Sequence, residues 1–114
     1  MKTASFRTYH GEGRISIARG ARGVARGFTV YRWLQPGDWF NSVDRDEYCR
    51  RYTEILARLD PQATWDGLHA LAAPHEPILM CWEVPPFTED NWCHRRLVAA
   101  WFEDKLGVEV PELQ

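Results

Sequence analysis

The sequence has no hydrophobic run long enough to cross a membrane. Its densest apolar stretch, Ile78–Trp82, stops at Glu83, whereas a membrane-spanning helix needs roughly 20 predominantly apolar residues. The first seven residues also lack the apolar core of a signal peptide. We therefore expect a cytoplasmic protein that makes no membrane contact.

Cysteines are few, and the glycines form no phosphate-binding pattern. The chain has three cysteines, an odd number, and in a reducing compartment such residues are typically thiols. We expect Cys49, Cys81 and Cys93 to be thiols rather than a disulfide framework. The glycines at positions 20, 23 and 27 match neither the P-loop nor the dinucleotide-binding pattern. No cofactor is expected.

Lysine is scarce, and the charges are unevenly distributed. The chain has 2 lysines against 12 arginines, and residues 1–32 carry a net charge of +6 against −8 for residues 33–114. Guanidinium groups suit recognition of phosphate or carboxylate, and Tyr9 and Tyr31 among these arginines could stack on single-stranded nucleic acid. The simpler interpretation is that these charges are solvated or pair with the acidic remainder of the chain. Both interpretations stay open, and we favour the second.

What is present is typical of one globular domain. The chain has 114 residues, of which 45% are hydrophobic and 26% charged, close to the average for soluble domains. No linker divides it, so residues 1–114 are expected to form a single domain. The predicted strands are short apolar or alternating segments: Phe6–Tyr9, Arg14–Ala18, Pro77–Glu83 and Val108–Val110.

Three segments carry helical periodicity and capping signals. Ser42 is expected to cap a helix over Val43–Leu59, and Asp60 precedes a proline that starts a second helix, which ends before Pro74. A third helix is predicted over Trp92–Leu106, with Gly107 after it. The fold class is therefore α/β: a single compact domain with a small mixed or partly parallel sheet and about three helices.

The chemistry is concentrated where the buried strand ends and the last helix begins. Cys81 and Glu83 share one face at the strand end, and Cys93, His94 and Arg95 start the helix. Ligands of open α/β sheets bind beyond the carboxyl ends of the strands, and a helix N-terminus attracts anions and lowers thiol pKa values. We predict a pocket for a small anion in which thiol catalysis is a further possibility.

Each candidate residue has an expected role. Cys81 or Cys93 would be the nucleophile, with Glu83 and His94 completing a catalytic set. The anion-binding residues would be Arg95, Arg96 and Arg19. An equally valid interpretation is that Glu83 and Arg95 form a structural ion pair with each other.

Two other functions are kept as alternatives. The first is a non-enzymatic nucleic-acid or nucleotide-binding module that uses the N-terminal arginines. The second is a structural zinc site formed by Cys81, Glu83, Cys93 and His94. Against zinc, the spacing lacks a paired C-x-x-C signature, and adjacent helical residues diverge by about 100°. Our site prediction therefore contains no metal ligand.

The motifs resemble those of a bacterial family. Leu79–Glu83, Cys93–Ala99 and Val110–Glu112, together with upstream segments such as Asp46–Tyr52, are similar to short members of the family called "domain of unknown function 488". The likeness covers about residues 14–112. It implies a compact α/β fold and a cytoplasmic bacterial setting, and it implies no established activity.

Overall fold

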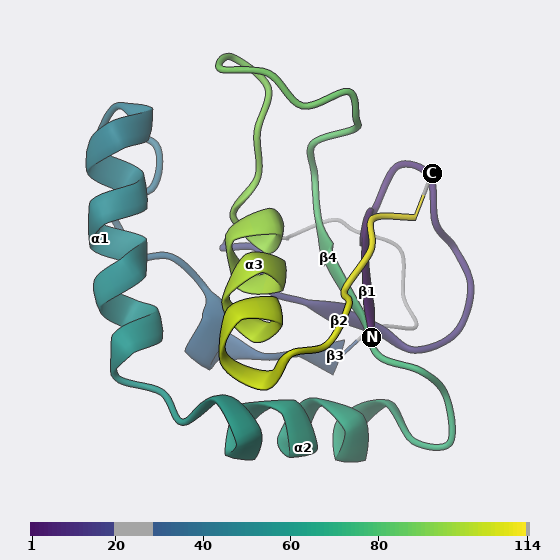
Figure 1. Cartoon of the computed structure of the whole chain (residues 1–114). Coiled ribbons are helices and arrows are strands. Elements are labelled where there is room, and N and C mark those ends of the chain that lie inside the picture. The colour runs from purple at the N-terminus through teal and green to yellow at the C-terminus, as the bar shows by residue number, and fades with distance from the viewer. Residues whose placement is uncertain (20–28, 114) are drawn as a thin grey trace.

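Four short parallel strands form the sheet on which the other elements pack (Figure 1). The computed structural model describes residues 1–19 and 29–113. Neighbouring strands are parallel in the order β1-β4-β2-β3. The expected α/β fold with a small, partly parallel sheet is thus confirmed. The strands are β1 (Lys2–Ser5), β2 (Arg14–Ser16), β3 (Thr29–Val30) and β4 (Ile78–Cys81).

Strand β4 lies inside the sheet, between β1 and β2. All four of its residues are buried, as expected for a parallel strand that is covered on both faces. Leu79 belongs to the large core beneath the helices, whereas Ile78 and Met80 belong to a smaller cluster that also contains Phe6. Because β4 is central, its last residue, Cys81, lies in the middle of the carboxyl edge of the sheet.

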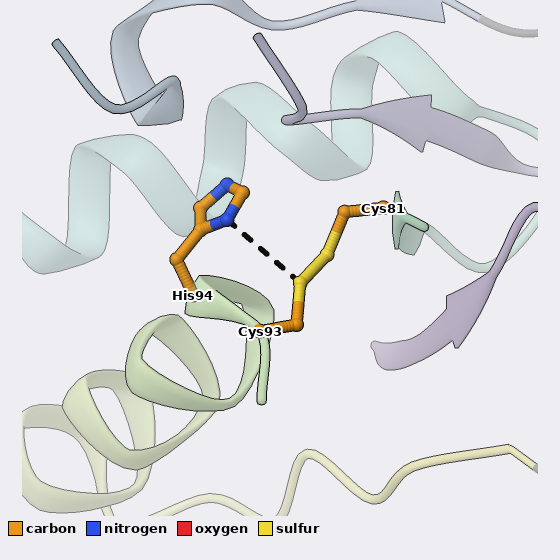
Figure 2. Close-up of side chains that lie close together, drawn as sticks. All are labelled: Cys81, Cys93 and His94. Atoms are coloured by element: carbon orange, nitrogen blue, oxygen red, sulfur yellow. Dashed lines mark hydrogen bonds between the residues drawn. A yellow bond between two sulfur atoms is a disulfide. The ribbon is translucent and has the colours of Figure 1, made fainter. Parts of the chain in front are cut away.

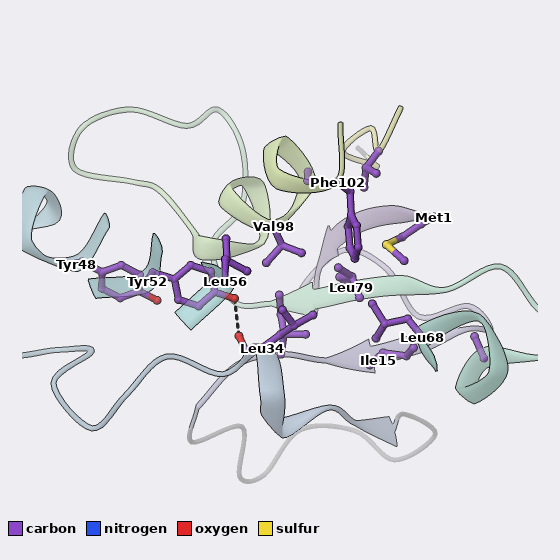
Figure 3. Close-up of a cluster of buried hydrophobic side chains, with 14 residues drawn as sticks. Met1, Ile15, Leu34, Tyr48, Tyr52, Leu56, Leu68, Leu79, Val98 and Phe102 are labelled. Carbon is purple, nitrogen blue, oxygen red and sulfur yellow. Dashed lines mark hydrogen bonds between the residues drawn. The ribbon is translucent and has the colours of Figure 1, made fainter. Parts of the chain in front are cut away.

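The three predicted helices are present, and they enclose the larger core. Helix α3 contacts β1 and β4, and both other helices pack against it (Figure 1). Figure 3 shows the core between them, where the hydroxyl of Tyr52 donates a 2.6 Å hydrogen bond to the carbonyl oxygen of Leu34. No helix in the described ranges is long and apolar enough to span a bilayer. The helices are α1 (Arg45–Ala57), α2 (Pro61–Ala72), α3 (His94–Leu106) and the short 3₁₀ helix η1 (Arg32–Leu34).

Local capping explains where the helices begin and end. The prediction that Ser42 caps the first helix is wrong, because the carboxylate of Asp44 accepts the backbone N–H of Glu47 at 2.9 Å and fixes the start at residue 45. Asp60 caps α2 as predicted. Gly107 also ends α3 as predicted, with a φ of 66° in the left-handed region.

The first strand covers Lys2–Ser5, directly before the predicted segment Phe6–Tyr9. Phe6–Tyr9 was predicted to be a strand, but β1 ends at Ser5. The backbone N–H groups of Thr8 and Tyr9 both donate to the carbonyl oxygen of Ser5. That turn places Phe6 in the smaller cluster, where its ring lies 5.1 Å from that of Trp82. The alternation of apolar and polar residues over Phe6–Tyr9 therefore indicated that a strand lies nearby but not which residues form it.

The C-terminal segment is also not the predicted strand. Val108–Val110 lies outside the sheet because the N–H of Val110 donates to the Glu103 carboxylate at 3.0 Å. The C-terminal segment instead meets β1 at an isolated bridge between Thr3 and Glu112. This bridge matters for the site, since it brings Glu112 to the start of α3.

Replacing Gly13 by alanine is expected to destabilise the fold by at least about 2 kcal/mol. Gly13 has a φ of 81°, and a Cβ there would collide with the backbone carbonyl oxygen of Glu76. The carbonyl of Gly13 also accepts the N–H of Ile78, the first residue of β4, at 2.8 Å, so the loop cannot easily shift. Urea denaturation of Gly13→Ala measures the loss.

Gly67→Ala is the matched control. Gly67 lies inside α2, and a Cβ there would meet no atom within 4 Å. Removing a flexible glycine from a helix should raise the unfolding free energy by about 0.5–1 kcal/mol. Equal effects of the two substitutions would contradict this account of Gly13.

Candidate functional site

A pocket of about 250 Å³ opens where β4 ends and α3 begins. Parallel sheets commonly bind ligands at this edge. Five of the seven predicted site residues line it, which are Arg19, Cys81, Glu83, Cys93 and His94. The remaining lining residues include aromatic side chains and one more acid, which are Ala18, Pro36, Phe40, Tyr48, Trp82, Asp90 and Trp92.

Cys81 and Cys93 form a disulfide (Figure 2). The expectation that all three cysteines are thiols is therefore wrong for this pair, while Cys49 on α1 carries a free, half-buried thiol. The physical reason is tertiary. The loop after β4 leaves the sheet edge and returns to it at the start of α3, so it brings the two cysteines together across a separation of 12 residues.

His94 is a buried, neutral histidine with a defined tautomer. Its Nε2 lies 2.7 Å from the carbonyl oxygen of Ile17. Because a carbonyl only accepts hydrogen bonds, Nε2 carries the proton and Nδ1 presents a lone pair. Nδ1 lies 3.8 Å from the Sγ of Cys93 (Figure 2). Burial lowers the pKa of His94 to about 4, and the charge of Arg95 acts in the same direction.

The convergence of Cys93 and His94 depends on the exact start of α3. The predicted helix began at Trp92, which would have turned these adjacent side chains apart. In the structure Cys93 is the N-cap residue, with an extended backbone at φ −144° and ψ 142°, and His94 is the first helical residue. The divergence of about 100° between consecutive helical side chains therefore does not apply to this pair.

Arg95 is completely buried, and its guanidinium donates hydrogen bonds to other groups of the protein. Its Nε and Nη2 bind the two carboxylate oxygens of Glu112 at 3.0 and 2.6 Å. Nη1 donates to the Sγ of Cys81 at 3.2 Å, and Nη2 also donates to the carbonyl oxygen of Glu83 at 2.6 Å. The expected Glu83–Arg95 ion pair is thus wrong, because Glu112 supplies the carboxylate. A role of Arg95 in holding an external anion stays a prediction.

The other two predicted anion-binding arginines lie in different places. Arg19 is exposed and lines the pocket, where its Nη1 donates to the carbonyl oxygen of Pro36 at 3.2 Å. Arg96 does not line the pocket, since its Nη1 binds the Thr3 hydroxyl at 2.9 Å and the Val110 carbonyl at 2.8 Å. Arg96 therefore joins α3 to β1 and to the C-terminal segment.

The alternative of nucleic-acid binding stays a prediction. Two of the N-terminal arginines, Arg7 and Arg32, lie over tryptophan rings at 5.9 and 5.0 Å from the ring centroids. Arg22 and Arg26 lie outside the described residues. The structure therefore does not place the complete set of arginines on which this alternative depends.

Sequence reasoning missed Glu112, the partner that makes the burial of Arg95 tolerable. A buried guanidinium requires a carboxylate, and this general rule was the available signal. It could not select Glu112 from the fifteen acidic residues between positions 33 and 114. The choice is made by the bridge between Thr3 and Glu112, which also includes a 2.5 Å hydrogen bond from the Thr3 hydroxyl to the Glu112 carboxylate.

Comparisons with family models, with curated proteins and with solved structures gave no match to this chain. The resemblance to the "domain of unknown function 488" family stays a prediction that rests on the motifs quoted above.

Glu112→Gln is expected to lower the free energy of unfolding by about 3 kcal/mol, because it leaves the charge of Arg95 buried without a counter-charge. The Arg95 side chain is fully buried and that of Glu112 is only 10% exposed, so solvent cannot compensate. Urea denaturation is the measurement. Glu109→Gln, at an exposed position in the same segment, should change stability by less than about 0.5 kcal/mol. Equal losses from the two variants would contradict the assigned role of Glu112.

The stability of the disulfide-bonded protein should fall as the pH is lowered from about 6.5 to about 4. The unfolded chain takes up a proton on His94 near its ordinary pKa of 6.5, while the folded chain does not until about 4. The expected loss is about 3 kcal/mol, after which this contribution is constant. Urea denaturation across this range measures the slope. His94→Gln, which keeps a side-chain N–H donor, should reduce it, and an unchanged slope in this variant would contradict the assignment.

Proposed function

We propose that this pocket performs thiol–disulfide exchange on a small substrate, with Cys81 as the nucleophile and Cys93 as the second thiol. The observation that carries the proposal is the Cys81–Cys93 disulfide in the wall of the pocket, with Nη1 of Arg95 3.2 Å from the Cys81 sulfur. A guanidinium beside a sulfur favours the thiolate, which is the nucleophilic form of cysteine. The anion that Arg95 stabilises is then the thiolate of reduced Cys81.

The two cysteines have different surroundings, which supports different roles. Cys81 contacts the cation of Arg95, whereas Cys93 faces the neutral Nδ1 of His94. A neutral imidazole accepts a hydrogen bond from a thiol, and this contact keeps Cys93 protonated while Cys81 is ionised. The first attack is therefore assigned to Cys81.

The proposed reaction has two steps. The Cys81 thiolate attacks one sulfur of a substrate disulfide, which forms a mixed disulfide and releases the first substrate thiolate. The sulfur of Cys93 then attacks Cys81, breaks the mixed disulfide, forms the Cys81–Cys93 bond and releases the second thiolate. The proton of Cys93 passes to one released thiolate, and the other takes up the proton that Cys81 lost when it ionised. The protein dithiol is oxidised and the substrate disulfide is reduced, so the electrons balance.

The charges of the pocket suit a small substrate that carries both signs. Arg19 lines the pocket together with Glu83 and Asp90. The substrate carboxylate, the anionic group expected from the sequence, would bind near Arg19 and the start of α3. Glu83 and Asp90 would bind its ammonium groups. Amino-acid or short-peptide disulfides have this chemistry, and a pocket of about 250 Å³ accommodates part of such a molecule.

A reducing compartment completes the proposal. Each turnover leaves the protein oxidised, and cytoplasmic thiol reductants return such disulfides to dithiols. We therefore propose the cytoplasm as the place of action.

Trapping with cystine, a zwitterionic disulfide, tests the order of attack. In reduced Cys93→Ser, a mixed disulfide should accumulate on Cys81, since the second thiol is missing. In Cys81→Ser, adduct formation on Cys93 should be slower by about tenfold or more, because a thiol without a nearby cation is mostly protonated at neutral pH. Mass spectrometry of the intact chain and of its peptides measures both rates.

Cys49→Ser is the matched control, because Cys49 lies on α1 and does not line the pocket. This variant should pass through both steps at the rate of the unmodified chain. Adduct formation on Cys81 that is no faster than on Cys49 would overturn the proposal. Faster adduct formation in Cys81→Ser than in Cys93→Ser would also overturn it.

A further inference from the structure

We infer from the geometry that the reduced protein binds one Zn²⁺ ion through Cys81, Cys93 and His94, with the fourth coordination position open to the pocket. The two sulfurs and a ring nitrogen of His94 all lie within 4.8 Å of one another. Within residues 1–19 and 29–113, this is the group of three or more His, Cys, Asp or Glu side chains whose ligand atoms lie close enough together to bind a metal ion. The inference goes beyond the proposed exchange reaction and does not require Cys81 to be its nucleophile.

The distances fit a tetrahedral ion. Zinc binds thiolate sulfur at about 2.3 Å and imidazole nitrogen at about 2.0–2.1 Å, so a sulfur and a nitrogen on one tetrahedral ion lie about 3.6 Å apart. The Sγ of Cys93 and Nδ1 of His94 are already 3.8 Å apart. The imidazole therefore needs only a small adjustment to become a ligand.

The backbone separation of the two cysteines also suits a bridging ion. Their Cα atoms lie 7.2 Å apart, beyond the roughly 4.4–6.8 Å that is usual for disulfides. Two thiolates on one zinc ion have their sulfurs about 3.8 Å apart. After reduction, the sulfurs can therefore separate to this distance while β4 and α3 stay in place.

The surrounding contacts are those that hold zinc ligands in position. A metal-binding histidine typically donates its other N–H to a carbonyl or carboxylate, and His94 does so to Ile17 at 2.7 Å. This hydrogen bond directs the Nδ1 lone pair toward the sulfurs. Arg95 donates to Cys81 at 3.2 Å while Glu112 balances its charge, so two thiolates and Zn²⁺ would form a site without net charge.

The open fourth position distinguishes this site from the structural zinc site considered from the sequence. Structural zinc ions have four protein ligands, whereas three protein ligands and one exchangeable position are typical of catalytic zinc. Glu83 lines the same pocket but does not belong to the cluster of three ligand atoms. Water or a polar group of a small substrate would therefore complete the coordination.

Equilibrium dialysis of the reduced chain against Zn²⁺ alone, in the presence of a phosphine reductant, tests the inference. We expect one zinc per chain for the unmodified protein and for Cys49→Ser. Affinity should fall by about 100-fold or more in Cys81→Ser, Cys93→Ser and His94→Gln, since each removes one of only three protein ligands. Co²⁺ in place of Zn²⁺ should give thiolate charge-transfer and tetrahedral ligand-field absorption bands.

A second measurement uses the unmodified chain and so does not depend on the variants folding. Zn²⁺ should protect Cys81 and Cys93 from alkylation but leave Cys49 as reactive as before. The oxidised protein should bind no zinc, because the disulfide removes two ligands.

Two results would overturn the inference: a reduced chain that takes up no zinc, or equal zinc uptake by Cys81→Ser, Cys93→Ser and the unmodified chain. The two proposals fail separately. A protein that exchanges cystine through Cys81 but binds no zinc loses only the metal site. A protein that binds zinc but shows ordinary thiol reactivity loses only the exchange function.

Discussion

The site depends on the buried ion pair between Arg95 and Glu112. A fully buried guanidinium is costly unless its donors are satisfied, and here they reach the carboxylate of Glu112, the carbonyl of Glu83 and the sulfur of Cys81. These contacts join the first turn of α3 to the C-terminal segment and to the end of β4. The disulfide crosses the same junction, so one charged group and one covalent bond hold the pocket wall in place.

His94 and the two cysteines of the pocket gain their chemical properties from this junction. His94 is buried by the same packing, which lowers its pKa to about 4 and leaves it neutral. Its hydrogen bond to Ile17 orients the ring so that Nδ1 faces Cys93. A thiol beside a guanidinium and a second thiol beside a neutral imidazole are two chemically different cysteines. This difference connects the proposed exchange reaction and the inferred zinc site, because each needs two thiols and each is switched off by the disulfide.

Sequence reasoning predicted several features of the structure that local physics controls. Asp60 and Gly107 bound their helices as expected because caps act within one turn of the chain. The buried apolar run before Glu83 contains the central strand. Reasoning failed where contacts are distant in the sequence, since Glu112 replaces Glu83 as the partner of Arg95. It also failed at two local features: Asp44 and not Ser42 caps α1, and the turn closed on Ser5 takes Phe6–Tyr9 away from the sheet. The helix start at His94 in place of Trp92 was a small error with a large effect on the site.

The sequence by itself determined the fold class and the set of reactive groups that gathers at the carboxyl edge of the sheet. Periodicity, caps and the order of apolar segments act over a few residues, and all are legible in the chain. Only the tertiary structure decided how those groups are paired. The loop after β4 brings Cys93 back to Cys81, the isolated bridge with Thr3 delivers Glu112 to Arg95, and Ile17 selects the tautomer of His94. Each pairing joins residues distant in the chain and depends on how the strands, loops and helices pack, so neither spacing nor composition could reveal it.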